Sequence, residues 1–320
     1  MGEFDLIKRF FDRQRGAEPG VVMGIGDDCA VLQPQPGMQW LVSTDMLVEG
    51  RHFLSTVEPQ RLGHKALAVN LSDLAACGAT PRAFTLALAL PRADANFLEG
   101  LARGLFELAD AHGIALVGGD TTAGPLNLSL TVMGEVPAGQ ALLRSGARVG
   151  DELWVSGCLG DARLALEQFR GRLALPGEGF EQVRRAMELP QPRVALGQQL
   201  RGIASSAIDI SDGLLGDLGH VLTRSAVGAQ IDFEALPHSA WLAAQPLALQ
   251  QLCLLNGGDD YELLFSAPAA QRAAVIDAAH RAATAVHRIG RIVATPGVQV
   301  LDASGQPMPV DSASFDHFRS

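Results

Sequence analysis

Aspartates beside short apolar runs are the feature that most constrains what this chain folds into. They recur, flanked by Gly, Ser or Thr, at Asp27–Asp28, Asp45, Asp73, Asp120, Asp209, Asp212 and Asp259–Asp260. In open α/β sheets, ligands bind at the ends of strands. Carboxylates gathered there would repel one another unless a hard divalent cation, which prefers oxygen ligands, held them together. The pattern therefore predicts an α/β fold with a magnesium–phosphate site at its strand ends.

The stretch 24–32 shows how much a single motif leaves open. Gly24 and Gly26 give the backbone freedom for a sharp bend, and Asp27 and Asp28 follow just before an apolar run. An Asx-type turn at the start of a strand explains this pair as well as a metal site does. Only the recurrence of such aspartates along the chain favours the metal site.

Composition narrows the class of protein. The length of 320 residues predicts about two domains, and 48% hydrophobic residues are enough for large cores. The formal net charge of −10 argues against a nucleic-acid partner bound by general attraction to its phosphates. The four cysteines form no Cys-x-x-Cys pair, and we expect neither a signal peptide nor a membrane span. These features together predict a cytoplasmic protein.

Hydrophobic periodicity predicts two halves in which strands and helices alternate. The expected helices are 3–15, 59–78, 96–112, one from Asp161, one within the loop and helix segment 170–192, 194–203, one after Gly213, and 268–283. The expected strands are 21–32, 39–44, 83–90, 114–117, 126–136, 152–156, 207–210, 261–265, 287–293 and 298–301. A connector containing Pro, Gly and Arg follows the first half, so we expect domains at 1–137 and 138–320.

Asp73 is the aspartate with the most specific helical context. It falls on the apolar face of helix 59–78, in line with Leu62, Ala66 and Val69. A carboxylate on that face should be paired or bound to a metal. A buried Asp held only by local hydrogen bonds is the alternative.

Four further places allow both a functional and a plain structural explanation. A bend at Gly118–Gly119 can form an anion-binding nest after strand 114–117. Arg144, in a Ser/Gly loop, suits a nucleotide phosphate or base, but it also suits a solvated linker. His52 either contacts an anionic ligand or is a loop residue without a functional role. Helix capping explains Ser211 or Asp212, whereas Asp209 inside the preceding strand points to bridging by Mg²⁺.

Seven motifs, taken in order, make the chain similar to the thiamine-monophosphate kinase family. They are Gly-Ile-Gly-Asp-Asp-Cys-Ala, Ser-Thr-Asp, Ala-Val-Asn-Leu-Ser-Asp-Leu-Ala-Ala, Gly-Gly-Asp-Thr-Thr, Arg-Ser-Gly-Ala, Asp-Ile-Ser-Asp-Gly-Leu and Gly-Gly-Asp-Asp-Tyr-Glu-Leu. The resemblance covers nearly the whole chain, and the family belongs to the superfamily of aminoimidazole-ribonucleotide synthetase and selenophosphate synthetase. It implies two α/β domains, with the N-terminal strands pairing across a homodimer.

The resemblance also implies an activity and a set of site residues. The activity is transfer of the γ-phosphoryl group of ATP to thiamine monophosphate, assisted by several Mg²⁺ ions. The implied Mg²⁺ ligands are Asp28, Ser43, Thr44, Asp45, Asp73, Asp120, Asp209 and Asp212, of which Asp73, Asp120 and Asp209 are the implied catalytic residues. Gly119, Asp120, Arg144 and Ser211 are implied to contact ATP, and His52, Asp259 and Phe315 to contact thiamine monophosphate.

Two other functions stay open at this point. One is a synthetase of the same superfamily that acts through a phosphorylated intermediate, and the other is a protein that binds nucleotides or divalent ions without catalysis. The chain departs from the family at Asp259, where the family usually has Glu. Asp is one methylene shorter than Glu, so we expect its reach to the thiamine moiety to differ.

Overall fold

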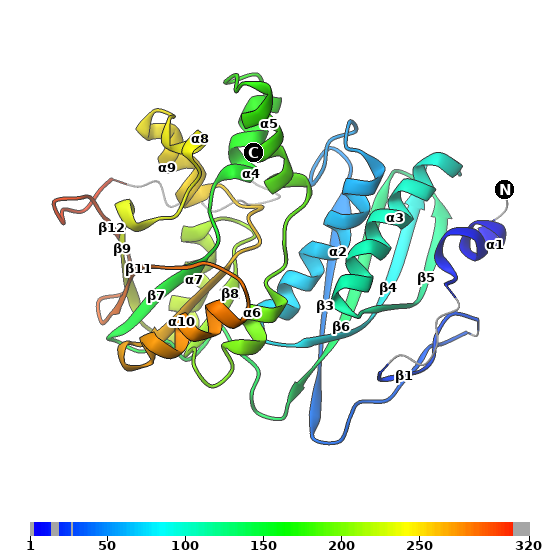
Figure 1. Ribbon diagram of the computed structural model, residues 1–320, viewed down its shortest axis with the longest axis horizontal. Helices are drawn as coiled ribbons and strands as arrows, with labels where there is room; N and C mark the ends of the chain where they lie inside the picture. Colours follow the sequence, from blue (N-terminus) through cyan, green and yellow to red (C-terminus); the bar gives the residue numbers. More distant parts are fainter. Residues whose placement is uncertain (1–2, 14–18, 27, 310–320) are drawn as a thin grey trace. The chain divides into compact units, whose positions relative to one another are not determined.

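The computed structural model describes residues 3–13, 19–26 and 28–309, and its chain forms two compact units (Figure 1). Unit 1 comprises Met1–Leu74 and Ala79–Gly139, and unit 2 comprises Ala75–Gly78 and Gln140–Ser320. Each unit combines helices with a sheet, which confirms the predicted mixed α and β class. The pairing of N-terminal strands across a dimer stays a prediction.

Unit 1 is built on a four-stranded sheet in the order β3-β6-β4-β5. β3 with β6 and β6 with β4 are antiparallel pairs, whereas β4 and β5 run parallel. The unit's elements are α1 (Glu3–Leu6), the π-helix η1 (Ile7–Phe11), β1 (Val21–Met23), β2 (Val31–Leu32), β3 (Met38–Val48), α2 (Pro59–Ala76), β4 (Thr80–Leu90), α3 (Ala95–His112), β5 (Ala115–Ala123) and β6 (Asn127–Pro137).

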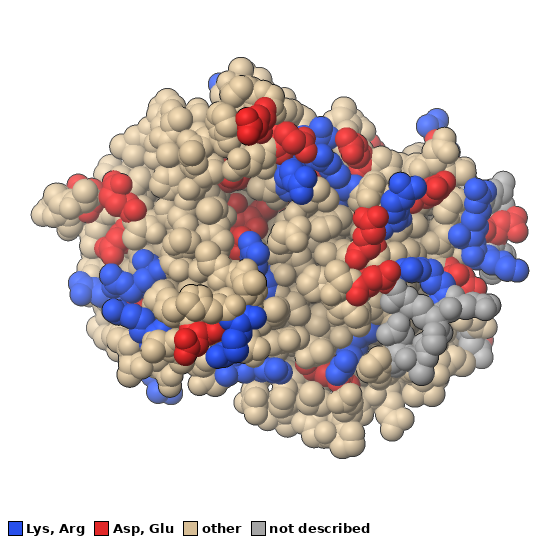
Figure 2. Space-filling view, in the orientation of Figure 1, with Lys and Arg blue, Asp and Glu red and all other residues tan. Residues whose placement is uncertain are grey.

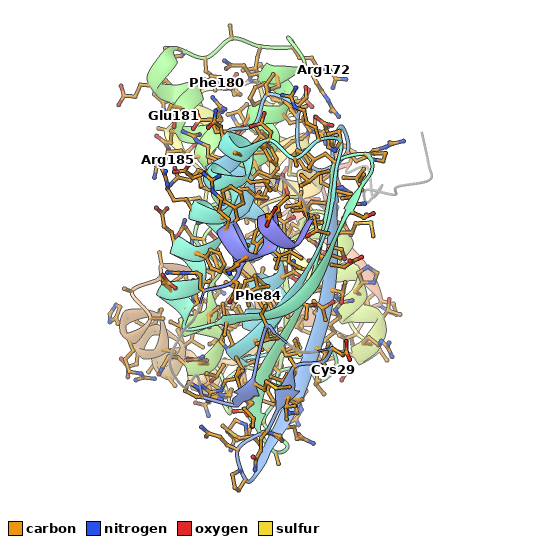
Figure 3. The ribbon with its side chains drawn as sticks, turned by 90° about the vertical axis from the view of Figure 1, so that its right-hand side faces the viewer. Cys29, Phe84, Arg172, Phe180, Glu181 and Arg185 are labelled. Carbon is orange, nitrogen blue, oxygen red and sulfur yellow. The ribbon has the colours of Figure 1, made fainter. Side chains whose placement is uncertain are left out.

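Helices α2 and α3 cover one face of this sheet (Figures 1 and 3). Buried residues on that face include Phe84, which Figure 3 labels, and Leu130, because side chains of a strand alternate between the two faces. On the opposite face, Val42 is 64% exposed and Met46 is 52% exposed. One face of β3 is therefore packed on helices, and the other presents apolar side chains to solvent.

The two helices approach each other closely because glycines lie at their crossing. A Cβ atom at Gly104 would be 1.8 Å from the carbonyl oxygen of Gln60, and one at Gly63 would be 2.0 Å from that of Leu101. The Asp94 carboxylate begins α3 by accepting hydrogen bonds from backbone N–H groups, and Gly113 ends it at φ 60°. Local signals thus set the ends of α3, and the glycines set its distance from α2.

Unit 2 contains a six-stranded sheet in the order β12-β9-β11-β7-β10-β8. Its elements are β7 (Asp151–Ser156), α4 (Asp161–Phe169), α5 (Gly177–Glu188), α6 (Val194–Gln199), β8 (Ser206–Asp209), α7 (Leu214–Ser225), β9 (Gly228–Asp232), η2 (Phe233–Ala235), α8 (Ala240–Ala243), α9 (Leu247–Asn256), β10 (Leu263–Pro268), η3 (Ala269–Gln271), α10 (Arg272–Arg281), β11 (Val286–Val293) and β12 (Gly297–Leu301). Its core joins strand residues such as Val155 and Leu264 to helix residues such as Leu218.

Several predicted elements differ from the structure. The expected strand 21–32 is two short strands, because the Gly24–Gly26 segment interrupts it. The expected Gly118–Gly119 bend is wrong, since β5 continues through both glycines to Ala123. The strand expected from Tyr261 begins instead at Leu263, because Tyr261 has φ 52°. The pattern did not indicate β9 or α9.

The surface of the described residues carries charges of both signs. On the face shown in Figure 2, Lys and Arg side chains are interspersed with Asp and Glu. Among the described residues, every helix is too short or too polar to cross a lipid bilayer.

Candidate active site

A pocket of about 580 Å³ opens in unit 1 beside β5. Its polar lining includes Asp28, from the loop that joins β1 to β2, and Asp120, from β5. Cys29, which Figure 3 labels, directly follows Asp28 in that loop. Two of the predicted aspartates, 92 positions apart in the sequence, therefore face the same pocket.

Gly118 and Gly119 line the pocket next to Asp120 for different reasons. A Cβ atom at Gly119 would lie 2.0 Å from the carbonyl oxygen of Leu86 on β4, and the backbone there has φ 154°. A Cβ atom at Gly118 would meet only the Thr85 methyl group, at 3.9 Å. Gly119 is thus required by close backbone approach, whereas Gly118 has room for a side chain.

Residues of β3 and α2 form a second polar group, on the helix-covered face of the sheet. The Ser43 hydroxyl donates a hydrogen bond to the Asp73 carboxylate. The backbone N–H of Asp45 donates to Asn70 Oδ1 at 3.0 Å, and the Asn70 amide donates to the carbonyl oxygen of Ala66. Asp73 lies on the predicted apolar face of α2, and this position brings its carboxylate to β3.

Thr44 lies on the opposite face of β3 from Ser43 and Asp45. Its hydroxyl is 2.8 Å from the hydroxyl of Thr131 on β6. Within the described residues, no three His, Cys, Asp or Glu side chains lie close enough together to hold a metal ion. The donor set still suits Mg²⁺ chemically, because carboxylate and hydroxyl oxygens are its preferred ligands and it commonly shares them with substrate phosphates and water.

His52 lies in the loop after β3, and its ring orientation is fixed locally. The backbone N–H of Val48 donates to His52 Nδ1 at 3.0 Å, so the neutral ring carries its proton on Nε2. The Lys65 ammonium, only 3% exposed, donates to the His52 carbonyl oxygen at 3.3 Å. Sequence reasoning did not single out Lys65, although it lies eight positions before Asp73 on the same face of the helix.

In unit 2, Asp209 is buried at the end of β8, and the turn Ser211–Gly213 leads from it into α7. One oxygen of the Asp217 carboxylate accepts hydrogen bonds from the backbone N–H groups of Ser211, Asp212 and Gly213 at 3.0–3.1 Å. The expected capping by Ser211 or Asp212 is wrong, since the N-cap is Gly213 and Asp217 reaches back from inside the helix. Asp217 therefore holds the turn and leaves the Ser211 and Asp212 side chains out of the capping.

The titration of Asp217 gives a pH prediction. Burial raises its pKa to about 6, from an ordinary value of 3.8, although its backbone hydrogen bonds act in the opposite direction. Between pH 4 and 6 the folded protein then keeps a proton that the unfolded chain has lost, so the free energy of unfolding falls as the pH rises. A difference of about 2 pKa units corresponds to about 3 kcal/mol.

Asp217→Asn tests this directly, because it keeps a side-chain oxygen acceptor and removes the titration. We expect the variant to be more stable than the parent at pH 7, with the advantage shrinking toward pH 4. Urea unfolding at pH 4 and pH 7 measures the difference in stability between the variant and the parent. An advantage of equal size at both pH values would contradict the assignment.

The loop Asp259–Tyr261 is joined by its backbone to the turn that Asp217 holds. The N–H of Asp259 donates to the carbonyl oxygen of Ser211 at 2.8 Å, and that of Tyr261 donates to the carbonyl oxygen of Ile210 at 2.8 Å. Asp259 and Tyr261 both have positive φ values, 64° and 52°, a conformation that costs free energy in residues other than glycine. These hydrogen bonds bring the predicted substrate residue Asp259 next to the predicted nucleotide residue Ser211.

Asp260 and Glu262 anchor the same loop to other parts of unit 2. The Asp260 carboxyl accepts a hydrogen bond from the Gly160 N–H at 2.9 Å, and desolvation raises its pKa well above the ordinary value. The buried Glu262 carboxylate accepts hydrogen bonds from Nε and Nη2 of the Arg193 guanidinium and from the Ser156 hydroxyl. Arg193 has no motif around it, so the sequence did not indicate its role.

Removing Arg193 should destabilise the protein, because Glu262 would become a buried charge without its cation. We expect Arg193→Ala to lower the free energy of unfolding by about 3 kcal/mol or more. The double variant Arg193→Ala/Glu262→Gln removes the orphaned charge and should recover part of that loss. Chemical denaturation of Arg193→Ala, Glu262→Gln and the double variant measures the energetic coupling between the two residues. Strictly additive losses in the free energy of unfolding would rule out this coupling.

The predicted nucleotide residue Arg144 lies at the other end of α7 from the Ser211 turn. Arg144 is exposed, and its loop is bound at the far end of α7, where the Ser225 hydroxyl accepts from the Gly146 N–H at 3.1 Å. Ser211 precedes the opposite end of this 12-residue helix, which is roughly 18 Å long. Phe315, as well as Asp27, lies outside the described residues.

Comparisons with known proteins agree with the family that the order of the motifs indicates. The family model for the AIR synthase related protein N-terminal domain matches residues 26–136, and that for the C-terminal domain matches residues 148–303. The chain is 44% identical over 320 residues to thiamine-monophosphate kinase of Escherichia coli K12, with 99% of this chain and 98% of that protein covered.

Solved structures give the same relationship. The thiamine-monophosphate kinase of Stenotrophomonas maltophilia K279a matches with a TM-score of 0.84 at 45% identity, covering 95% of this chain and 96% of that one. A structure described as AaThiL complexed with AMPPCP and TMP matches with a TM-score of 0.76 at 29% identity, covering 98% and 96%.

Proposed function

The chain belongs to the thiamine-monophosphate kinase family, and from this premise we propose that it transfers the γ-phosphoryl group of ATP to thiamine monophosphate, giving thiamine diphosphate and ADP. The observation that carries the proposal is the 44% identity over nearly the whole chain. The relative solved with AMPPCP and TMP supports the same pair of substrates. The pocket at Gly118–Asp120 supports a nucleotide site in unit 1.

The acceptor needs no general base. A phosphate monoester has a second pKa of about 6, so it is already mostly deprotonated at neutral pH and can attack directly. The barrier is the meeting of two polyanions, which must be aligned in line and have their charge neutralised. A site built from oxygen ligands and backbone N–H groups suits that task better than one built around a catalytic base.

We assign the proposed Mg²⁺ to the oxygen donors Asp28, Ser43, Thr44, Asp45, Asp73, Asp120, Asp209 and Asp212. When bound, Mg²⁺ supplies charge neutralisation for the phosphates. The hydrogen bond between Ser43 and Asp73 holds the Asp73 carboxylate at β3. Asp28 and Asp120 line the pocket in which the ATP phosphates are proposed to lie.

The remaining residues are proposed to orient the two substrates. Gly119, Asp120, Arg144 and Ser211 are assigned to ATP, and His52, Asp259 and Phe315 to thiamine monophosphate. His52 presents its Nε2 proton, which suits a phosphate oxygen, because Nδ1 is engaged by Val48. The backbone link from Asp259 to Ser211 supports adjacent binding of the two substrates.

We further propose a cytoplasmic homodimer with functional domains at 1–137 and 138–320. The exposed apolar face of β3, with Val42 and Met46, supports a second copy of the chain as its partner. The four cysteines, none of which forms a disulfide in the structure, are compatible with a reducing compartment. Light scattering of the purified protein would give its oligomeric state.

The activity test is incubation with ATP, Mg²⁺ and thiamine monophosphate, followed by chromatography of the thiamine phosphates. Thiamine diphosphate and ADP should form in equal amounts, and neither should form when thiamine monophosphate is omitted. ADP release without thiamine diphosphate would favour a synthetase of the same superfamily. Nucleotide binding without turnover would favour a non-catalytic protein.

A further inference from the structure

The loop that carries Asp259 adopts a backbone conformation that most side chains disfavour. Residues 257–262 join α9 to β10, and both Asp259 and Tyr261 lie in the left-handed region, at φ 64° and 52°. Asp tolerates this region better than most residues, but the conformation still persists only where surrounding contacts impose it. The direction in which the Asp259 side chain leaves the backbone therefore depends on what holds the loop.

The loop is packed against its neighbours by close backbone approach. A Cβ atom at Gly258 would lie 2.7 Å from the carbonyl oxygen of Ser211, in the turn after β8. A Cβ atom at Gly160, in the segment that joins β7 to α4, would lie 3.0 Å from the backbone of Cys253 in α9. Neither glycine has room for a side chain, so the segments around Asp259 form a closely packed frame.

Asp260 is the side chain that ties the loop to the segment between β7 and α4. Its Oδ1 accepts a hydrogen bond from the N–H of Gly160 at 2.9 Å. Desolvation raises the pKa of this carboxyl group, and the nearby Glu262 and Asp259 carboxylates add to the effect. Because the uncharged form is favoured, Asn, which keeps the oxygen acceptor, is the closest substitute for Asp260.

Other groups hold the surroundings of Asp260 without it. Glu262, at the end of the loop, is fixed by the Arg193 guanidinium, and the turn that contains Ser211 is fixed by the Asp217 carboxylate. Loss of the Asp260 side chain should therefore leave these parts in place. What it releases is the middle of the loop, where Asp259 lies.

We propose that Asp260 is a positioning residue for thiamine monophosphate: its hydrogen bond to Gly160 fixes the direction of the adjacent Asp259 carboxylate and thereby sets the affinity for this substrate. The inference rests on the proposed function for the identity of the substrate and for its contact with Asp259. Thiamine monophosphate carries a cationic ring, and the attraction between a carboxylate and a cation falls as their separation grows. A carboxylate that is held in one direction also loses less conformational freedom when the substrate binds.

The first test compares Asp260→Ala with Asp260→Asn in steady-state kinetics. We expect Asp260→Ala to raise the KM for thiamine monophosphate roughly fivefold to tenfold, the scale of one net hydrogen bond. The KM for ATP and kcat should stay within about twofold of the parent values, because Asp217 still holds the Ser211 turn. Asp260→Asn should restore the parent KM for thiamine monophosphate to within about twofold.

Asp302→Ala is the matched control for loss of a carboxylate that accepts backbone hydrogen bonds. Asp302 accepts the N–H groups of Ser304 and Gln306 in the turn after β12, a strand at the opposite edge of the sheet from β8. Its kinetic constants should equal those of the parent. An unchanged KM for thiamine monophosphate in Asp260→Ala, an equal rise in the KM for ATP, or failure of Asn to restore the parent value would overturn the proposal.

A double-mutant cycle tests whether Asp260 acts through Asp259. If it does, Asp260→Ala should have little further effect on the KM for thiamine monophosphate once Asp259 is Ala. Additive effects of the two substitutions would show that Asp260 acts on the substrate by another route and would refute the positioning role. If Asp260→Ala does not fold, Asp260→Leu, which removes the acceptor but keeps the volume, takes its place in both tests.

Calorimetric binding of thiamine monophosphate in the absence of ATP separates this inference from the proposed function. If the parent binds it more tightly than Asp260→Ala does, yet forms no thiamine diphosphate, the positioning role stands and the proposed activity fails. If the parent is fully active and its affinity does not change on loss of Asp260, the activity stands and the positioning role fails.

Discussion

Asp120→Ala should lower kcat by about a hundredfold or more, the scale on which a single preorganised electrostatic contact acts in catalysis. The Asp120 carboxylate faces the pocket beside Asp28. Without it, the proposed cation site loses a charge where the two phosphorylated substrates are proposed to meet. The fold should not change, because Asp120 is exposed and surface substitutions usually alter the free energy of unfolding by less than about 0.5 kcal/mol. Steady-state kinetics and thermal unfolding measure the two effects separately.

Asp277→Ala, on the exposed side of α10, is the matched control for loss of one aspartate, and its kcat should stay at the parent value. Asp73→Ala should resemble Asp120→Ala in its kinetics. Ser43→Ala, which removes only the hydroxyl that donates to Asp73, should reduce kcat less. Near-normal turnover in purified Asp73→Ala or Asp120→Ala would count heavily against the assigned site.

Gly119→Ala should be the most damaging single-methyl substitution in the pocket. The new Cβ would lie 2.0 Å from the Leu86 carbonyl oxygen, a backbone atom of β4 that cannot move without breaking the parallel ladder between β4 and β5. We expect a loss of about 2 to 3 kcal/mol in the free energy of unfolding, from overpacking and from the positive φ value. Any folded fraction should bind ATP more weakly, because the strand that carries Asp120 would be displaced.

Gly118→Ala is the control for this prediction, since it adds the same methyl group one residue earlier. Its Cβ would be 3.9 Å from the Thr85 methyl group, an ordinary contact, so the unfolding transition should stay close to that of the parent. Differential scanning calorimetry of the pair is the direct comparison. Equal stability of the two variants would show that β4 and β5 are not as close as the structure has them.

Local features of the sequence were enough to place most elements. The predicted helix 96–112 agrees closely with α3, because an Asp cap, an amphipathic repeat and a terminal Gly are all local signals. The position of Asp73 on the packed face of α2 also follows from the helical period alone, and its contact with Ser43 agrees with it. The family could likewise be recognised from the order of its motifs.

Other features depended on contacts between distant parts of the chain. Nothing near Gly118 indicates that β5 continues through the glycine pair, because the register with β4 decides it. Arg193 pairs with Glu262, 69 positions away, and no sequence period connects them. Similarly, no motif indicates that the carboxylate of Asp217, inside α7, holds the turn that precedes the helix.

The sequence by itself determined most of the helices and strands, the acidic motifs and the family, since periodicity, capping residues and short motifs act over a few neighbouring positions. Only the tertiary structure decided that Ile7 and Phe11 share a pocket with Asp28 and Asp120. That cavity is formed by four segments that are distant in the sequence, and their meeting depends on strand register and helix packing. Such contacts are properties of the folded chain, so no local pattern encodes them.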